Sequence, residues 1–136
     1  MGTWSHGNFD NDTALDWLDD ITGQLLDEIA EAMASPQSLG ADEPDADLVP
    51  CRIELLCVMT ENGMEPQWPA SATLARWKET FLAAWDASID ALEPDADYRH
   101  NRRLTLEATF DRMLALAAAQ ADESGDWEEE REVGGD

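Results

Sequence analysis

The residues best suited to chemistry in this sequence form a basic cluster at positions 98–103. Arg99, Arg102 and Arg103 are three of only eight lysines and arginines in the chain, and His100 lies among them. Guanidinium groups bind carboxylates and phosphates through paired hydrogen bonds, and the free N–H groups at a helix start attract the same anions. The cluster therefore predicts an anion or carboxylate site at the start of a helix.

The same cluster also has a purely structural interpretation. A cation at a helix start is disfavoured by the helix dipole by roughly 0.3–1 kcal/mol, so another interaction must offset that cost. Intramolecular ion pairs would do so, with partners at positions 10–12 or at Asp95 and Asp97. The sequence leaves both interpretations of the cluster open.

Other catalytic arrangements are not evident. His6 and His100 are the only histidines and are possible general bases, but no serine or cysteine motif accompanies them. The sequence also lacks a Gly-rich phosphate loop and the His-Glu spacing of zinc enzymes. The acidic loops 43–47 and 93–97, both Glu-Pro-Asp-Ala-Asp, lack the spacing of a calcium loop. We therefore expect no catalytic residues, no metal site and no cofactor.

The charge of the chain restricts its partners. The 136 residues contain 31 aspartates and glutamates against eight lysines and arginines, a formal net charge of −23 at pH 7. This charge disfavours direct binding to nucleic acid or to anionic membranes and favours a basic protein partner. Two further interpretations stay open, namely mimicry of a nucleic acid by carboxylates and general adaptation to a salty or acid-rich cytoplasm.

The apolar spacing predicts an all-α fold. Apolar residues recur at three- and four-residue steps, and no segment alternates long enough to indicate a strand. We expect Pro50 to open the second helix, which is apolar nearly all round and should be central, and Ser71 to cap the third. Trp17, Trp77 and Trp85 lie on the expected core stripes. The expected helices span about 12–34, 50–61, 71–93 and 101–122.

These elements predict one compact bundle of about four helices over residues 1–122, with an irregular N-terminal clasp. Residues 123–136 are expected to form an acidic, flexible tail. Cys51 and Cys57 read as reduced, half-buried core residues. The sequence shows neither a signal peptide nor an apolar run of membrane-spanning length, so we expect a cytoplasmic protein.

The N-terminal segment carries a dense motif. Its conspicuous residues are Gly2, Trp4, Gly7, Phe9, Asn11, Asp12, Ala14, Asp16 and Trp17. This pattern resembles the opening of the bacterial family called domain of unknown function 4259, with Ser5 and Asp10 as departures from it. The resemblance covers about 17 residues and implies no particular activity.

The residues of this motif suggest a structural clasp. Gly2 and Gly7 would permit turns with positive φ, Trp4 and Phe9 would fold back on the first helix, and Asn11 with Asp12 would cap it. If the segment is a site instead, its best members are Trp4, His6, Asn11, Asp12 and Asp16, together with the basic cluster.

The leading functional hypothesis is a non-catalytic binding protein, of the immunity or antitoxin kind, that presents an acidic helical surface to a basic protein partner. The main alternative is a small ligand-binding or enzymatic domain built from the N-terminal motif and the cluster at Arg99–Arg103. Mimicry of a nucleic acid is a special form of the leading hypothesis.

Overall fold

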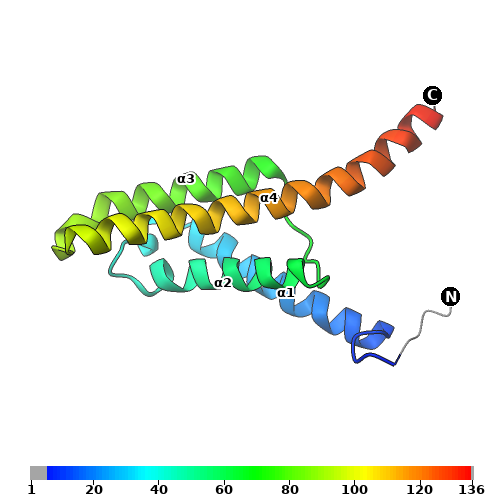
Figure 1. Ribbon diagram of the computed structural model, residues 1–136, viewed down its shortest axis with the longest axis horizontal. Helices are drawn as coiled ribbons and strands as arrows, with labels where there is room; N and C mark the ends of the chain where they lie inside the picture. Colours follow the sequence, from blue (N-terminus) through cyan, green and yellow to red (C-terminus); the bar gives the residue numbers. More distant parts are fainter. Residues whose placement is uncertain (1–5, 136) are drawn as a thin grey trace.

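A computed structural model describes the backbone of residues 6–135 and the side chains of residues 6–122. The described chain contains four α-helices and two short 3₁₀ helices and no strand, which confirms the predicted all-α bundle (Figure 1). The elements are α1 (Asp12–Met33), η1 (Pro36–Leu39), α2 (Pro44–Glu61), α3 (Ser71–Ser88), η2 (Ile89–Leu92) and α4 (Ala96–Gly135).

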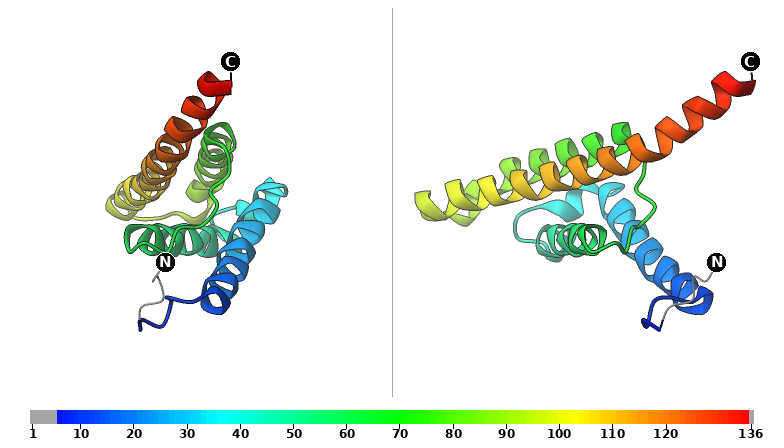
Figure 2. Two further views of the ribbon diagram at one scale, coloured as in Figure 1. Left: turned by 90° about the vertical axis from the view of Figure 1, so that its right-hand side faces the viewer. Right: turned by 45° about the vertical axis from the view of Figure 1, so that its right-hand side comes forward.

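The helices pack around α2 and α4. α2 and α4 run in the same direction, whereas α3 runs back along α4 in the opposite direction (Figure 1). α1 crosses α2 at an angle, and its N-terminal half extends away from the other helices (Figure 2). This arrangement leaves much of the surface of α1 open to solvent.

All four α-helices contribute to one hydrophobic core. Ile29 of α1, Ile53 of α2 and Leu74 of α3 are fully buried, and the rings of Phe81 and Phe110 join α3 to α4 at a centroid distance of 5.3 Å. Complete burial of each such side chain contributes roughly 1.5–3 kcal/mol. The apolar sides of α3 and α4 therefore contribute to the core, whereas Leu92 after α3 is 49% exposed.

The first helix departs from the predicted stripe at its start. Trp17, expected in the core, is 57% exposed, and Leu15 is 44% exposed. The helical period places both residues as predicted, but this part of α1 extends beyond the helices that would cover it. Trp77 and Trp85 are buried as expected.

α2 begins earlier than the sequence suggested. Pro44, not Pro50, occupies the first turn, and Asp45 and Asp47 add carboxylates that the helix dipole favours there. Pro50 lies inside the helix, where it donates no hydrogen bond to the preceding turn. The connection between the first and second helices, expected to extend to position 50, is consequently short and includes η1.

One side of α2 is exposed, contrary to the prediction that this helix has no solvent-facing side. Leu48, Leu55 and Val58 are 44%, 50% and 41% exposed, and Cys51 is exposed as well. Only Cys57 is a buried cysteine, so the expectation that both are half-buried is wrong. The near-continuous apolar sequence of α2 conceals an outward face that is also apolar.

The ends of α3 also differ from the prediction. Ala70 stands at the N-cap position without a side-chain hydrogen bond, and Ser71 is the first helical residue instead of the cap. The regular helix ends at Ser88, whose Oγ accepts a hydrogen bond from the backbone N–H of Ala41 at 2.8 Å. This bond ties the segment before α2 to the end of α3.

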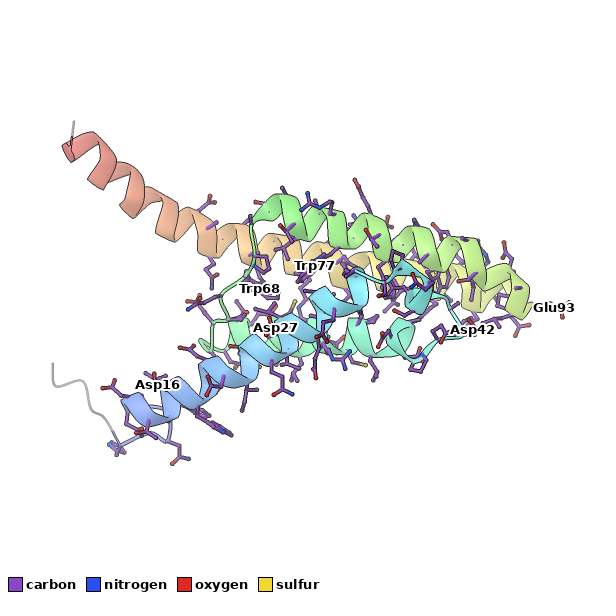
Figure 3. The ribbon with its side chains drawn as sticks, turned by 180° about the vertical axis from the view of Figure 1, so that it is seen from behind. Asp16, Asp27, Asp42, Trp68, Trp77 and Glu93 are labelled. Carbon is purple, nitrogen blue, oxygen red and sulfur yellow. The ribbon has the colours of Figure 1, made fainter. Side chains whose placement is uncertain are left out.

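The two Glu-Pro-Asp-Ala-Asp loops share a sequence but not a backbone. Glu43 is extended with φ of −94°, whereas Glu93 adopts the left-handed conformation with φ of 51°. Asp42 and Glu93 nevertheless lie at the same end of the molecule (Figure 3). After the second loop, α4 begins at Ala96, earlier than the predicted start near 101.

The backbone of α4 continues as a helix to Gly135, past the predicted end at 122. The acidic segment 123–136 is therefore helical over most of its length. Whether it behaves as a flexible tail stays a prediction.

Candidate functional site

The N-terminal motif caps α1. The side-chain oxygen of Asn11 accepts a hydrogen bond from the backbone N–H of Ala14 at 2.8 Å, and its amide donates to the carbonyl of Asn8 at 3.4 Å. Asp12 follows in the first turn, where a carboxylate is favoured by the helix dipole. The predicted capping role of Asn11 is therefore present, while Asp12 contributes charge and no cap.

Gly7 and Asp10 form a tight turn ahead of this cap. The N–H of Asp10 donates to the carbonyl of Gly7 at 3.1 Å, and the N–H of Gly7 donates back to Asp10 Oδ2 at 2.9 Å. A Cβ atom on Gly7 would lie 2.3 Å from that oxygen. A side chain at Gly7 would therefore displace the Asp10 carboxylate, and Gly7 does not have the positive φ that the sequence suggested.

The remaining candidates of the N-terminal motif do not converge. His6, Asp12 and Asp16 are exposed, and Trp4 lies outside the described residues. Asp16 sits on the part of α1 that extends away from the bundle (Figure 3). No hollow found among the described residues is lined by residues 6–16.

Two arginines of the basic cluster are engaged in ion pairs. Arg103 donates to Asp86 through Nε at 2.9 Å and Nη2 at 3.1 Å, and it also lies 3.5 Å from Glu107. Hydrogen bonding to Asp86 raises the pKa of Arg103, so the arginine stays charged. Neither carboxylate is a predicted partner. Asp86 belongs to α3, which runs antiparallel to α4, and Glu107 lies one turn further along α4.

Arg99 is engaged in a similar way. Its Nε lies 2.7 Å from Asp90 Oδ1, and its guanidinium carbon stands 5.8 Å from the centre of the Trp85 ring. Charge and ring contact together fix this side chain against the end of α3. His100, between the arginines, is exposed.

Arg102 is the exception in the cluster. Among the described residues it has neither an ion pair nor a hydrogen bond from its side chain, although it is half-buried. It lines two hollows, one at the start of α4 and one between α2 and α4. The predicted anion site thus reduces to one available guanidinium.

Cations outside the basic cluster also form ion pairs between different helices. Arg52 pairs with Glu28 at 3.1 Å and joins α2 to α1, and Lys78 pairs with Asp111 at 2.7 Å and joins α3 to α4. Further pairs join α4 to α3, to η2 and to α2. Those pairs are Arg103–Asp86, Arg99–Asp90 and Arg112–Glu61.

The N-terminal motif and the basic cluster lie far apart in the fold. The chain enters α1 at one end of the molecule, whereas α4 begins at the other (Figure 1). None of the five main hollows among the described residues is lined by members of both segments. The structure therefore does not bring the two halves of the alternative site together.

The outer surface of α1 is strongly anionic. The helix carries seven carboxylates and no basic residue. Only Glu28 among them takes part in an ion pair with a described residue. Asp16, Asp19, Asp20 and Asp27 are exposed. Because the chain has few cations, most of the negative charge on α1 is not neutralised by ion pairs.

A groove of about 450 Å³ runs beside this surface, between α1, the loop after α2 and the start of α3. Trp77 and Leu26 give it apolar walls, while Asp19 and Asp27 stand at its edge. Asp27 and Trp77 are marked in Figure 3. Gly23 also lines the groove, and a Cβ atom there would meet nothing within 4 Å.

Sequence reasoning missed this groove. Its lining comes from three separate segments, and residues such as Gln67 and Pro69 carry no motif. The available signal was Gly23 in the middle of a helical pattern, since a glycine there weakens the helix and often marks a close approach or an open surface.

The described residues contain neither a membrane-spanning helix nor a cluster of metal ligands. No helix among them is both long and apolar enough to cross a membrane. No group of three or more histidine, cysteine, aspartate or glutamate side chains is arranged to hold a metal ion in this part of the chain.

These features define a small all-helical domain with an acidic surface and interhelical ion pairs. The chain belongs to the family described as Domain of unknown function (DUF4259), whose sequence model matches residues 2–133. The match extends far beyond the N-terminal motif that suggested it. Comparisons with curated proteins and with solved structures find no match.

Proposed function

We propose that this protein binds a basic protein partner through the outer face of α1 and the groove beside it. The observation that carries the proposal is the pairing of an apolar groove with a carboxylate edge on a helix without any cation. Apolar contacts in such a groove supply affinity, and the surrounding carboxylates select a basic partner and speed its association.

The placement of α1 supports this assignment. Its N-terminal half extends from the bundle, and Trp17 and Leu15 are exposed there beside Asp16. Exposed tryptophan is a frequent anchor in protein interfaces, where it buries a large apolar surface. The partner would therefore contact both the groove and the protruding part of α1.

A basic toxin neutralised by an acidic immunity protein is the specific form that we propose. A nucleic-acid-binding protein, captured by carboxylates in place of phosphates, is a special case of the same interface. The free thiols of Cys51 and Cys57 support action in a reducing compartment, and we propose the cytoplasm.

The groove can be blocked without damaging the fold. Gly23→Leu places a side chain in open space and replaces a poor helix former, so it should stabilise α1 by roughly 0.5–1 kcal/mol. We expect this variant to lose partner binding while its thermal stability is unchanged or higher. Binding at the wild-type level would refute the groove as the docking site.

The charge requirement needs a matched pair of variants. One carries Asn in place of Asp16, Asp19 and Asp27, and the other carries Asn in place of Asp42, Asp47 and Asp95. Both lose three negative charges, but the second triplet lies away from α1, near the start of α2 and α4.

The variants are immobilised and exposed to extract of the source cells, and retained proteins are identified by mass spectrometry. We expect a basic protein on the wild type and the second variant, absent from the first and released by about 0.5 M salt. Equal retention by both variants, or release indifferent to salt, would contradict the proposal. Competition by duplex DNA would identify the partner as a nucleic-acid-binding protein.

A further inference from the structure

The groove between α2 and α4 is a second hollow with a different character. It encloses about 420 Å³ and is lined by Pro50, Cys51, Glu54, Leu55 and Val58 of α2 and by Arg102, Thr105 and Thr109 of α4. A volume of this size is typical of small-molecule sites. Most of its lining is apolar, and it lies on the exposed side of α2.

Arg102 gives this groove one cationic end. The flanking arginines are occupied, since Arg99 pairs with Asp90 and Arg103 pairs with Asp86. Glu54 lines the same groove but forms no ion pair with Arg102. A half-buried arginine without an ion pair is unusual in a chain of net charge −23, because carboxylates are plentiful.

The hydroxyl groups of the two threonines in the groove already form hydrogen bonds within α4. Thr105 donates its hydroxyl proton to the carbonyl of Asn101 at 3.1 Å, and Thr109 donates to the carbonyl of Thr105 at 2.8 Å. Neither threonine therefore offers a hydroxyl donor to a ligand. Three residues beyond Thr109 and Val58, Arg112 and Glu61 pair and tie α4 to α2.

The geometry points to a binding site for a small amphipathic monocarboxylate, a carboxylate carried on an apolar chain. Arg102 would bind the carboxylate through paired hydrogen bonds, and Leu55 and Val58 would cover the chain. A second copy of this protein is a poor occupant, since it would bring another charge of −23 to the contact. This site is separate from the partner surface proposed on α1.

The probe is decanoate, titrated into the full chain at about 0.15 M salt and followed by two-dimensional NMR. We expect shifts confined to amides of residues 50–58 and 102–109. Affinity should increase roughly two- to fourfold for each methylene from hexanoate to decanoate, since full burial would give about fourfold. Decan-1-ol, which has the chain without the charge, should bind at least about tenfold more weakly.

Three single variants separate the roles of the charges. Arg102→Gln should weaken decanoate binding about tenfold, whereas Glu54→Gln should strengthen it by removing a like charge from the groove. Arg103→Gln is the matched control, because it removes a neighbouring arginine that is already paired, and its affinity should change less than about twofold.

The Arg103→Gln control also tests whether weaker binding merely reflects a less stable protein. Arg103→Gln loses an interhelical ion pair and should be the less stable protein, whereas Arg102→Gln loses none. Binding that Arg102→Gln leaves unchanged, or shifts spread over other surfaces, would show adventitious contact and overturn the proposal. Binding of an apolar peptide through its C-terminal carboxylate, but not of decanoate, would also overturn it.

Discussion

Arg103 on α4 binds Asp86 on α3 through two separate nitrogen–oxygen contacts, at 2.9 and 3.1 Å. A two-point arrangement fixes both the distance and the rotation of the two helices at this position. The pair joins α4 to α3, and these two helices run side by side in opposite directions (Figure 1). It illustrates how this chain uses its few cations, since each of the described ion pairs of α2 and α3 likewise reaches another element.

Removing either partner of this pair should lower the free energy of unfolding by about 0.5–1 kcal/mol, a small value because both side chains are partly exposed. Urea denaturation of Arg103→Gln, Asp86→Asn and the double variant measures the coupling. We expect the double variant to lose less than the sum of the single losses. Arg76→Gln is the control, since Arg76 is exposed and has no ion pair among the described residues. Strict additivity would argue against the pair.

Asn11 should matter to the start of α1. Asn11→Ala removes the oxygen that accepts from Ala14 and should cost about 1 kcal/mol of unfolding free energy. Asn11→Asp keeps an acceptor at the same position and should stay close to the wild type. Urea denaturation followed by circular dichroism tests both. Equal losses in the two variants would indicate that the amide's contact with Asn8 is the important one.

Gly7 should tolerate a side chain only when Asp10 is shortened. In Gly7→Ala the new Cβ displaces the Asp10 carboxylate, so the bond from the Gly7 N–H is lost at a cost of about 0.5–1.5 kcal/mol. In an Asp10→Ala background the same substitution should have little further effect. Hydrogen exchange of the first turn of α1 provides the local measurement, and an equal effect in both backgrounds would contradict this explanation.

The buried thiol of Cys57 should lower the free energy of unfolding at high pH. Burial raises the pKa of its thiol from 9.0 to about 11, so the unfolded chain ionises first as the pH increases. Its contribution is complete below pH 9 and disappears between about pH 9 and 11, with an expected loss of roughly 2–3 kcal/mol. Comparing the slope of unfolding free energy against pH in wild type and Cys57→Ala cancels the other titrating groups. Parallel slopes would contradict the prediction.

The sequence could predict the helices because their apolar periods are local properties. The stripe containing Trp77 and Phe81 became core as expected, and Asn11 revealed the start of α1 through its capping chemistry. The start of α2 was predicted wrongly at Pro50, because a proline inside a helix cannot be distinguished in the sequence from one in the first turn. The burial of Trp17 was predicted wrongly, because α1 extends past the elements that would cover this side chain.

The sites depend on relationships that one sequence does not display. Asp86, the partner of Arg103, belongs to the helix that runs back along α4, and Asp90, the partner of Arg99, belongs to η2 at the end of that helix. Sequence proximity therefore suggested the wrong partners. The availability of Arg102 follows from those pairings and appears only once they are known. The α1 groove is likewise assembled from three distant segments.

Acidic and basic residues of this protein should differ in how well they tolerate mutation, because the paired cations join different helices. Exposed aspartates such as Asp16 and Asp20 make no described ion pair, so they can be gained, lost or exchanged with little effect on folding. Arg52, Arg103 and Arg112 each join two helices, and their loss weakens the bundle itself. As far as folding is concerned, the net charge of this domain can therefore change through its unpaired acidic residues, whereas the arginines that join two elements are constrained.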